Sequence, residues 1–204
     1  MSLYQRILGN PFVYNHVRPL AVGGIDMTPF YRRVAADQDS VILDVGCGTG
    51  DALRYLGAFR SYLGIDTEQI AIDFARREYT GSPRVSFECR RATREDFEAL
   101  APSHVLLGGL LHHLDDTEAL DVLGMALRSP RLRRIVTNDI VYLPKAPISN
   151  LLARLDRGRF CRREPAYRAL AERAGLRVAE SAIVRCHPTR GLAKYLMMTL
   201  EPDG

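Results

Sequence analysis

Short apolar runs alternate with amphipathic stretches along most of the chain. The first run, Val41–Val45, is rich in β-branched residues and ends at a cluster of glycines, as buried strands often do. Similar runs follow at residues 62–65, 85–87, 104–107 and 134–138. The pattern therefore predicts a series of buried strands that are separated by helical segments.

The segments between these runs have the spacing of amphipathic helices. A helix is expected over residues 51–59, and Thr67 is expected to be the N-cap of the next one. Strands that alternate with helices in this way indicate βαβ units on a mostly parallel sheet covered on both faces. The residues expected on the buried helix faces are Leu53 and Leu56, then Ile70, Phe74 and Ala75, and, in a helix that opens at Thr117, Leu120, Leu123 and Leu127.

The last part of the chain follows a different pattern. A helix over residues 165–174 ends at Gly175, and two apolar segments follow at residues 177–185 and 194–200. The residues between these segments include Pro188 and Gly191 and lack helical periodicity, so the two segments are expected to pair as antiparallel strands.

Length and composition place the chain among single-domain globular proteins. It has 204 residues, of which 47% are hydrophobic and 25% charged. Its apolar runs are far shorter than the roughly 20 residues of a membrane-spanning helix. Arg6, Asn10, Pro11 and His16 interrupt the N-terminal residues, which therefore do not resemble a signal peptide. We expect a cytoplasmic protein without a membrane span.

The charged and sulfur-containing residues narrow the choice of chemistry. The formal net charge is +4, and only Lys145 and Lys194 are lysines among 28 cationic side chains. The arginines are spread along the whole chain, which favours a compositional bias over a nucleic-acid partner. Four cysteines form no C-x-x-C pair, so we expect neither a metal site nor a disulfide framework.

The most informative segment is the glycine-rich turn after the first strand. Glycines at positions 46, 48 and 50 allow the backbone to approach a ligand closely. A dinucleotide-binding G-x-G-x-x-G motif would need a glycine at position 51, where the chain has Asp51. Asp44 adds a second carboxylate just before the turn. Two acids favour a ligand that is positively charged and lacks phosphates, which argues against a dehydrogenase.

A further acid stands at the end of the second predicted strand. Asp66 follows Gly46 by 20 residues, the position from which a carboxylate accepts hydrogen bonds from both ribose hydroxyls. A cationic nucleoside without phosphates describes S-adenosylmethionine (SAM), whose sulfonium and amino group are positive. The three acids and the glycine turn together predict a SAM site.

The run LDVGCGTG at residues 43–50, together with Asp66, resembles motif I and the following acidic position of the class I SAM-dependent methyltransferases. The resemblance covers roughly residues 38–200. It implies an α/β fold, a Rossmann-like three-layer sandwich whose seven-stranded, mostly parallel sheet has an antiparallel last strand. The cofactor-binding positions that it implies are Asp44, Gly46, Cys47, Gly48, Asp66, Thr67, Ala92 and Gly109. Arg91 departs from the family, which often has an acid there that contacts adenine.

The segment HVLLGGLLHHLDD at residues 104–116 resembles the fourth-strand region of small-molecule methyltransferases. Its histidines, His113 and His112, are candidate general bases, because imidazole takes up a proton near neutral pH. Asp139, at the end of the fifth predicted strand, matches a commonly acidic family position. It is expected to contact the substrate or to anchor a histidine. The segment lacks the N/D-P-P-Y/F motif of exocyclic amino methylation in DNA.

Two stretches outside the strand–helix alternation are expected to cover the site. Residues 1–36 are predicted to form an N-terminal helical cap that brings Tyr14 to the substrate. The methyltransferase domain is expected over residues 37–204, with a substrate-cap insertion at about residues 140–163. Arg157 and Arg159 in that insertion are candidates for binding an acidic group, because a guanidinium pairs well with carboxylate or phosphate.

These observations predict a SAM-dependent methyltransferase that acts on a small organic acceptor, at oxygen or at an activated carbon. A nucleic-acid methyltransferase acting on RNA is one alternative, which the positive charge supports. A SAM-binding protein without transfer activity is another. The sequence leaves the oligomeric state open.

Overall fold

Seven strands form one mixed sheet in the computed structural model, which describes residues 27–155, 158–185 and 194–203. Their order across the sheet is β3-β2-β1-β4-β5-β7-β6. Only β7 runs against its neighbours β5 and β6, and the pairs from β3 to β5 are parallel. The predicted fold class is confirmed. The strands are β1 (Val41–Val45), β2 (Ser61–Asp66), β3 (Val85–Cys89), β4 (His104–Gly108), β5 (Arg134–Ile140), β6 (Leu176–Arg185) and β7 (Lys194–Pro202).

The central strands are apolar on both faces because helices cover both sides of the sheet. All five residues of β1 are buried. Side chains alternate along a strand, so Leu43 and Val45 join one core cluster and Ile42 joins the other. This double burial explains why the strand reads as a continuous apolar run rather than as an alternating one.

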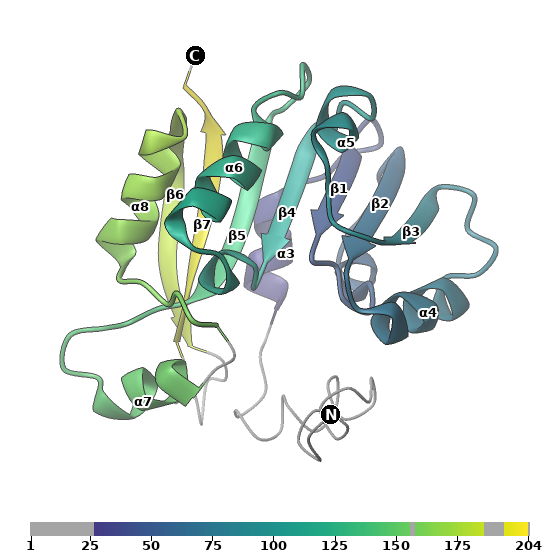
Figure 1. Ribbon diagram of the computed structural model, residues 1–204. Coiled ribbons are helices and arrows are strands. Elements are labelled where there is room, and N and C mark those ends of the chain that lie inside the picture. The colour runs from purple at the N-terminus through teal and green to yellow at the C-terminus, as the bar shows by residue number, and fades with distance from the viewer. Residues whose placement is uncertain (1–26, 156–157, 186–193, 204) are drawn as a thin grey trace.

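Figure 1 shows the three layers. The core cluster around Leu43 includes residues of α5 (Arg94–Glu98), α6 (Asp116–Ala126) and α8 (Glu164–Arg173). The cluster around Ile42 includes residues of α3 (Thr28–Val34), the 3-10 turn η2 (Asp51–Arg54) and α4 (Gln69–Glu78). A capping box between Asp115 and Glu118 begins α6, one residue before the Thr117 expected from sequence.

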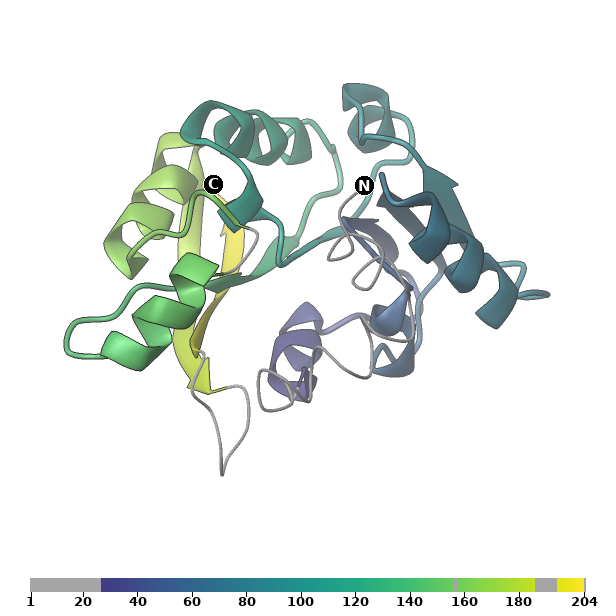
Figure 2. The same cartoon turned by 60° about the horizontal axis from the view of Figure 1, so that its bottom comes forward.

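The insertion between β5 and α8 forms its own small core. Helix α7 (Pro147–Leu155) packs through Ala153 onto Ile140 and Tyr195. Its other side carries Ile148 and Leu151, which are 59% and 55% exposed. Figure 2, in which the lower edge of the sheet comes forward, shows α7 and α3 on opposite sides of that edge.

Two local predictions were wrong. The helix expected over residues 51–59 is reduced to η2, a single 3-10 turn, because Gly57 disfavours helix continuation soon after it starts. The N-cap of α4 is Glu68 instead of Thr67, since the Asp66 side chain accepts the Glu68 amide at 2.9 Å. The buried residues of α4 are accordingly Ile72 and Ala75, while Ile70 is 53% exposed.

Part of the predicted cap lies outside the described residues, including Tyr14. Within the described part of the chain, α3 covers the sheet below β4 and β5, as a buried Phe30 and the close approach of its ring to Gly108 indicate. None of the helices in these described ranges is long and apolar enough to cross a membrane.

Candidate functional site

The predicted site residues gather at one edge of the sheet. The parallel strands β1, β2, β4 and β5 all end there. The glycine turn follows β1 and Gly109 follows β4, while Asp66 is the last residue of β2 and Asp139 the last but one of β5. Open α/β sheets bind their ligands at this carboxyl edge. The arrangement therefore brings together residues that are distant in sequence.

The glycine turn after β1 is open on one side. Gly46, Gly48 and Gly50 have φ angles of +78°, +54° and +76°, which favour glycine. A Cβ atom on Gly48 would meet no described residue within 4 Å, whereas one on Gly50 would lie 2.8 Å from Cζ of Phe87. Gly50 is thus required for packing, and Gly48 faces a space that a ligand can enter.

Asp66 fixes this turn against the end of β2. Its Oδ2 accepts a hydrogen bond from the Gly48 amide at 2.8 Å, and its Oδ1 accepts the Glu68 amide. The side chain is only partly buried, so its remaining lone pairs can accept further donors. Thr67 follows it and is exposed. The acid shapes the ligand-facing turn and stands beside it.

Asp44 lies beneath the turn and is 5% exposed. The hydroxyl of Tyr62 donates to its Oδ2 at 2.7 Å. Burial raises the pKa of Asp44 to about 7, and the charges of Asp66 and Asp51 raise it too, while the Tyr62 hydrogen bond lowers it. Three carboxylates therefore act on one another around the glycine turn, and a bound cation would relieve their repulsion.

The other groups close to Asp44 are neutral. Burial, with a further contribution from the charge of Asp44, raises the pKa of the Cys47 thiol and of the Tyr31 hydroxyl. The ring of Tyr31, from α3, stacks on Tyr55 with the centroids 4.8 Å apart. Cys47 is consequently a protonated thiol at neutral pH, and we assign it a packing role at the turn instead of a nucleophilic one.

The raised pKa of Asp44 predicts a pH-dependent stability. Its ordinary value is 3.8, so folding favours the protonated carboxyl. The stability from this neutral form is fully present below about pH 4 and is lost as the pH rises through about 7. We expect Asp44→Asn to be more stable than the wild type by about 2–4 kcal/mol at about pH 8.

Urea unfolding at about pH 5 and pH 8 measures this difference. Tyr62→Phe is the matched control, because it removes the hydrogen bond to Asp44 and should steepen the loss of stability with pH. Equal pH dependence in Asp44→Asn and the wild type would contradict the assignment.

The 3-10 turn η3 (Leu111–His113) places the two histidines beside the end of β5. His112 is 3% exposed, and its Nδ1 lies 2.8 Å from Oδ1 of Asp139, which also accepts the His112 amide at 3.0 Å. Asp139 is 1% exposed. A carboxylate in this position keeps the proton on Nδ1, so Nε2 becomes the basic nitrogen.

The position of Nε2 follows from the contacts of the neighbouring ring carbons. Cε1 of His112 lies 3.7 Å from where a Cβ of Gly109 would be, at the end of β4. Cδ2 on the other side approaches Gly158. Nε2 therefore lies between the carboxyl end of β4 and the chain around Gly158. His113 is exposed, and its ring centroid is 4.3 Å from that of His112.

The loop after β3 is held by ion pairs. Arg90 contacts both carboxylate oxygens of Asp96, at 2.7 and 2.6 Å, and also pairs with Glu88. Ala92 in this loop is half-buried, while Arg91 is exposed. In the insertion, Arg159 is exposed and Arg157 lies outside the described residues.

Sequence reasoning missed several residues of this site. Tyr62 and Tyr31 stand close to Asp44, and Gly64 leaves room for Cys47, because a Cβ there would be 2.8 Å from the Cys47 Sγ. A tyrosine in the middle of a buried strand needs a partner for its hydroxyl, and this need was the available signal for Tyr62.

Comparison with known proteins identifies one matching sequence family. Residues 42–131 match the sequence model of a family described as a methyltransferase domain. No curated protein sequence shows significant similarity to the chain.

Several solved structures share the fold. One is a chain of the complex between the Haloferax volcanii Trm112 methyltransferase activator and its candidate methyltransferase (TM-score 0.69, 17% identity, 97% of this chain and 98% of that chain). Cyclopropane synthase MmaA2 from Mycobacterium tuberculosis has a TM-score of 0.67 at 12% identity, over 86% of this chain and 82% of that chain. Magnesium protoporphyrin IX methyltransferase from Synechocystis, with bound SAM, has a TM-score of 0.61 at 16% identity, and the match covers 98% of this chain and 89% of that chain.

The structural likenesses establish the fold, and the matched family describes the segment that holds the glycine turn, Asp66 and the histidines. The chain thus has the fold of these solved methyltransferases, and its residues 42–131 are similar to a methyltransferase domain.

Proposed function

We propose that the protein methylates a small organic acceptor whose reacting oxygen or activated carbon must lose a proton. The observation that carries this proposal is the buried His112–Asp139 pair at the carboxyl edge of β4 and β5. Methyl transfer to an already nucleophilic nitrogen or sulfur needs no base, whereas a phenol, an enol or a hydroxyl does. A preformed base therefore favours the second group of acceptors.

The residues around the glycine turn fit SAM. The open side of Gly48 leaves space for a ligand against the backbone, and Asp66 stands at the end of β2 with lone pairs for ribose hydroxyls. Asp44, near the same turn, suits a positively charged amino group. SAM supplies an electrophilic methyl group when it is bound. We infer that Gly46, Cys47, Thr67, Ala92 and Gly109 line the rest of this site.

His112 is proposed as the general base. Its Nε2 would take the proton from the acceptor, while Asp139 holds the ring through Nδ1 and stabilises the imidazolium that forms. The exposed His113 is the alternative base, and its ring packs on that of His112. Water excluded from the pair by the chain around Gly158 would otherwise compete for the proton.

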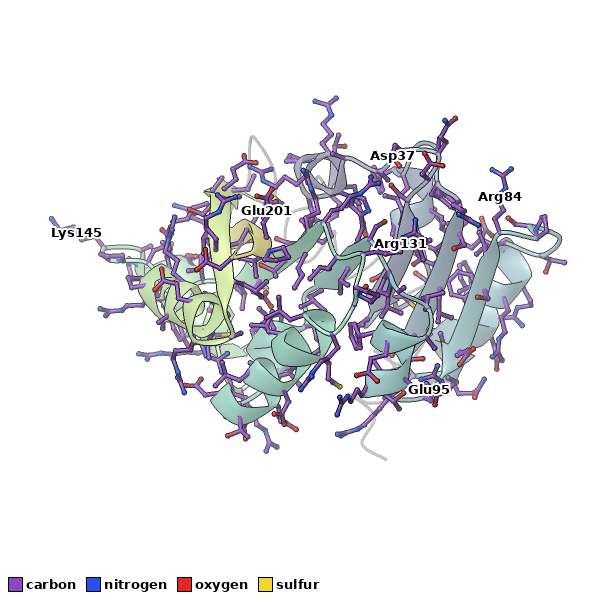
Figure 3. All side chains as sticks on the ribbon, turned by 90° about the horizontal axis from the view of Figure 1, so that it is seen from above. Asp37, Arg84, Glu95, Arg131, Lys145 and Glu201 are labelled. Atoms are coloured by element: carbon purple, nitrogen blue, oxygen red, sulfur yellow. The ribbon has the colours of Figure 1, made fainter. Side chains whose placement is uncertain are left out.

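Ion pairing argues against the nucleic-acid alternative. Many of the described arginines contact acids, among them Arg33 with Glu180, Arg94 with Glu98, Arg133 with Asp37, Arg168 with Glu164 and Arg177 with Glu201. Figure 3 shows Lys145 and Arg84 at opposite ends of the molecule, so these two cations lie far apart. A salt-dependent affinity for RNA would reverse this preference.

Gly48→Ala should weaken SAM binding by about 10- to 100-fold. The new methyl group enters the proposed ligand space, and it would clash with none of the residues that the structure describes. The affinity change corresponds to about 1–3 kcal/mol and is measured by calorimetry.

Gly81→Ala is the matched control. Gly81 also has a positive φ, +86°, and a Cβ there would meet no residue of the described ranges within 4 Å, but Gly81 lies in the turn before β3. Both variants should lose about 1–2 kcal/mol of stability from the left-handed backbone. Unchanged SAM affinity in Gly48→Ala would remove the turn from the cofactor site.

A panel of acceptors tests the proposed reaction class. Phenols, enolisable ketones and hydroxy acids are incubated with SAM and the protein, beside primary amines, thiols and RNA. We expect S-adenosylhomocysteine to form with an acceptor of the first group. Turnover only with amines, thiols or RNA would overturn the proposal, and tight SAM binding without any turnover would favour a SAM-binding protein that lacks transfer activity.

A further inference from the structure

A short segment after α7 lies directly on His112. We call residues 158–162 the covering segment. A Cβ on Gly158 would lie 2.2 Å from Cδ2 of His112 and 2.7 Å from its carbonyl oxygen, so the backbone there is in close contact with the imidazole. The amide of Phe160 donates to the same His112 carbonyl at 3.0 Å. The covering segment and the histidine are thus packed as one unit.

Arg162 binds the covering segment to η3. Its Nη1 donates to the carbonyls of Leu111 and Phe160 at 2.9 Å each, and its Nη2 donates to the carbonyl of Leu114 at 2.8 Å. Nε and Nη2 also contact Oδ1 of Asp116, at 3.0 and 2.7 Å. All five N–H groups of the guanidinium are used in this way, and the side chain is 9% exposed.

The backbone of Arg162 joins the same unit to the end of β5. Its carbonyl accepts the Tyr142 amide at 3.0 Å, and the hydroxyl of Tyr167 donates to the Ile140 carbonyl at 3.0 Å. The guanidinium lies over the Tyr167 ring, 5.7 Å from its centroid. Arg162 therefore connects both elements that carry the histidine–aspartate pair, η3 through its side chain and β5 through its backbone.

We propose that Arg162 is a positioning residue, which locks the covering segment across His112 and so keeps the imidazole against Asp139 and away from water. This inference rests on the proposed role of His112 as the base. The carbonyls of Leu111 and Leu114 flank the two histidines, so the side chain that binds both carbonyls fixes the turn between them. A lysine cannot replace it, because the guanidinium is a planar fork whose nitrogens reach three carbonyls and the Asp116 carboxylate at once. A single ammonium nitrogen cannot span these separate acceptors.

The test compares Arg162→Met with Arg168→Met in the full-length protein. Arg168 is also partly buried and paired, with Glu164 and Ser181, but it contacts neither the histidine turn nor the covering segment by these bonds. We expect Arg162→Met to lower kcat by about 10- to 100-fold and to leave SAM affinity unchanged. Arg162→Lys should rescue little of this loss, and Arg168→Met should keep wild-type turnover.

Two measurements without substrate separate positioning from catalysis. Hydrogen exchange of the Phe160 amide should accelerate in Arg162→Met, because the bond to the His112 carbonyl is lost. Nitrogen NMR of the His112 imidazole should show a loss of the single Nδ1-protonated tautomer and a shifted titration. Among the described residues, the ionisable groups around His112 include Asp139, His113, Tyr167, Cys161, Asp116 and Arg162, so the titration is compared at a fixed ionic strength.

Gly158→Ala provides a second route to the same result, since it displaces the covering segment while Arg162 stays in place. Wild-type exchange and wild-type imidazole signals in a folded Arg162→Met would overturn the proposal. If these signals change and turnover does not, Arg162 positions His112 but His112 is not the base. This result would overturn the proposed function, and with it the catalytic part of the role inferred for Arg162.

Discussion

His112→Ala is expected to lower turnover by about 100- to 10,000-fold, the range that a general base contributes. SAM affinity should stay within a factor of about two, because His112 contacts Asp139, His113, the covering segment and Gly109 at the end of β4, and Gly109 itself is unchanged in the variant. Single-turnover kinetics at saturating SAM with an accepted acceptor measures the chemical step.

His113→Ala is the matched control for this variant. His113 is exposed and neighbours His112 in the same turn, so the variant changes an imidazole at the same location without removing the bond to Asp139. A large loss in His113→Ala with full activity in His112→Ala would transfer the base assignment to His113. Asp139→Asn should lower kcat in the same way as His112→Ala, since the asparagine amide no longer keeps the proton on Nδ1 of His112.

Asp66→Ala is expected to weaken SAM binding by about 100- to 1,000-fold. Each hydrogen bond to a charged acceptor contributes about 1.5–3 kcal/mol, and Asp66 is proposed to accept two from the ribose. The variant also releases the Gly48 amide, which Asp66 holds at 2.8 Å, so the turn itself loses definition. Calorimetry with SAM and with S-adenosylhomocysteine measures the loss.

Asp73→Ala controls for the removal of a carboxylate. Asp73 lies on α4, the helix that follows Asp66, and is exposed, with its Oδ1 accepting from Gln69 at 2.7 Å. It should bind SAM as the wild type does. If Asp66→Ala and Asp73→Ala have equal affinities, Asp66 makes no direct contact with the cofactor.

The mostly parallel sheet with an antiparallel end was predictable from sequence because it depends on local pattern. The run at Val41–Val45 is apolar on both faces, which indicates a buried parallel sheet. The sequence between the last two apolar segments lacks helical periodicity, which favoured the antiparallel pairing that β6 and β7 show. The prediction of a helix after the glycine turn was wrong, since burial of its apolar residues did not compensate for the low helix propensity of Gly57. Thr67 does not cap α4, because the side chain of Asp66 accepts the hydrogen bond from the Glu68 amide.

The contacts within the site were harder to predict from sequence because they join residues that are far apart along the chain. The bond between Tyr62 and Asp44 depends on the register in which Asp44 lies opposite Gly64, two residues beyond Tyr62. The contact of Gly158 with His112 joins an insertion to the end of another strand. Asp139 was expected to contact substrate or to anchor a histidine, and the structure places it against His112.

The shortness of η2 has an electrostatic consequence for the ligand. A full helix beginning at Asp51 would direct about half a positive elementary charge at the mouth of the turn, which suits a pyrophosphate and repels a sulfonium. A four-residue turn carries only a fraction of that dipole, and Asp51 stands in its first turn. The local field at this corner is consequently set by carboxylates instead of by aligned peptide groups, and it is negative where a nucleotide-binding fold would make it positive.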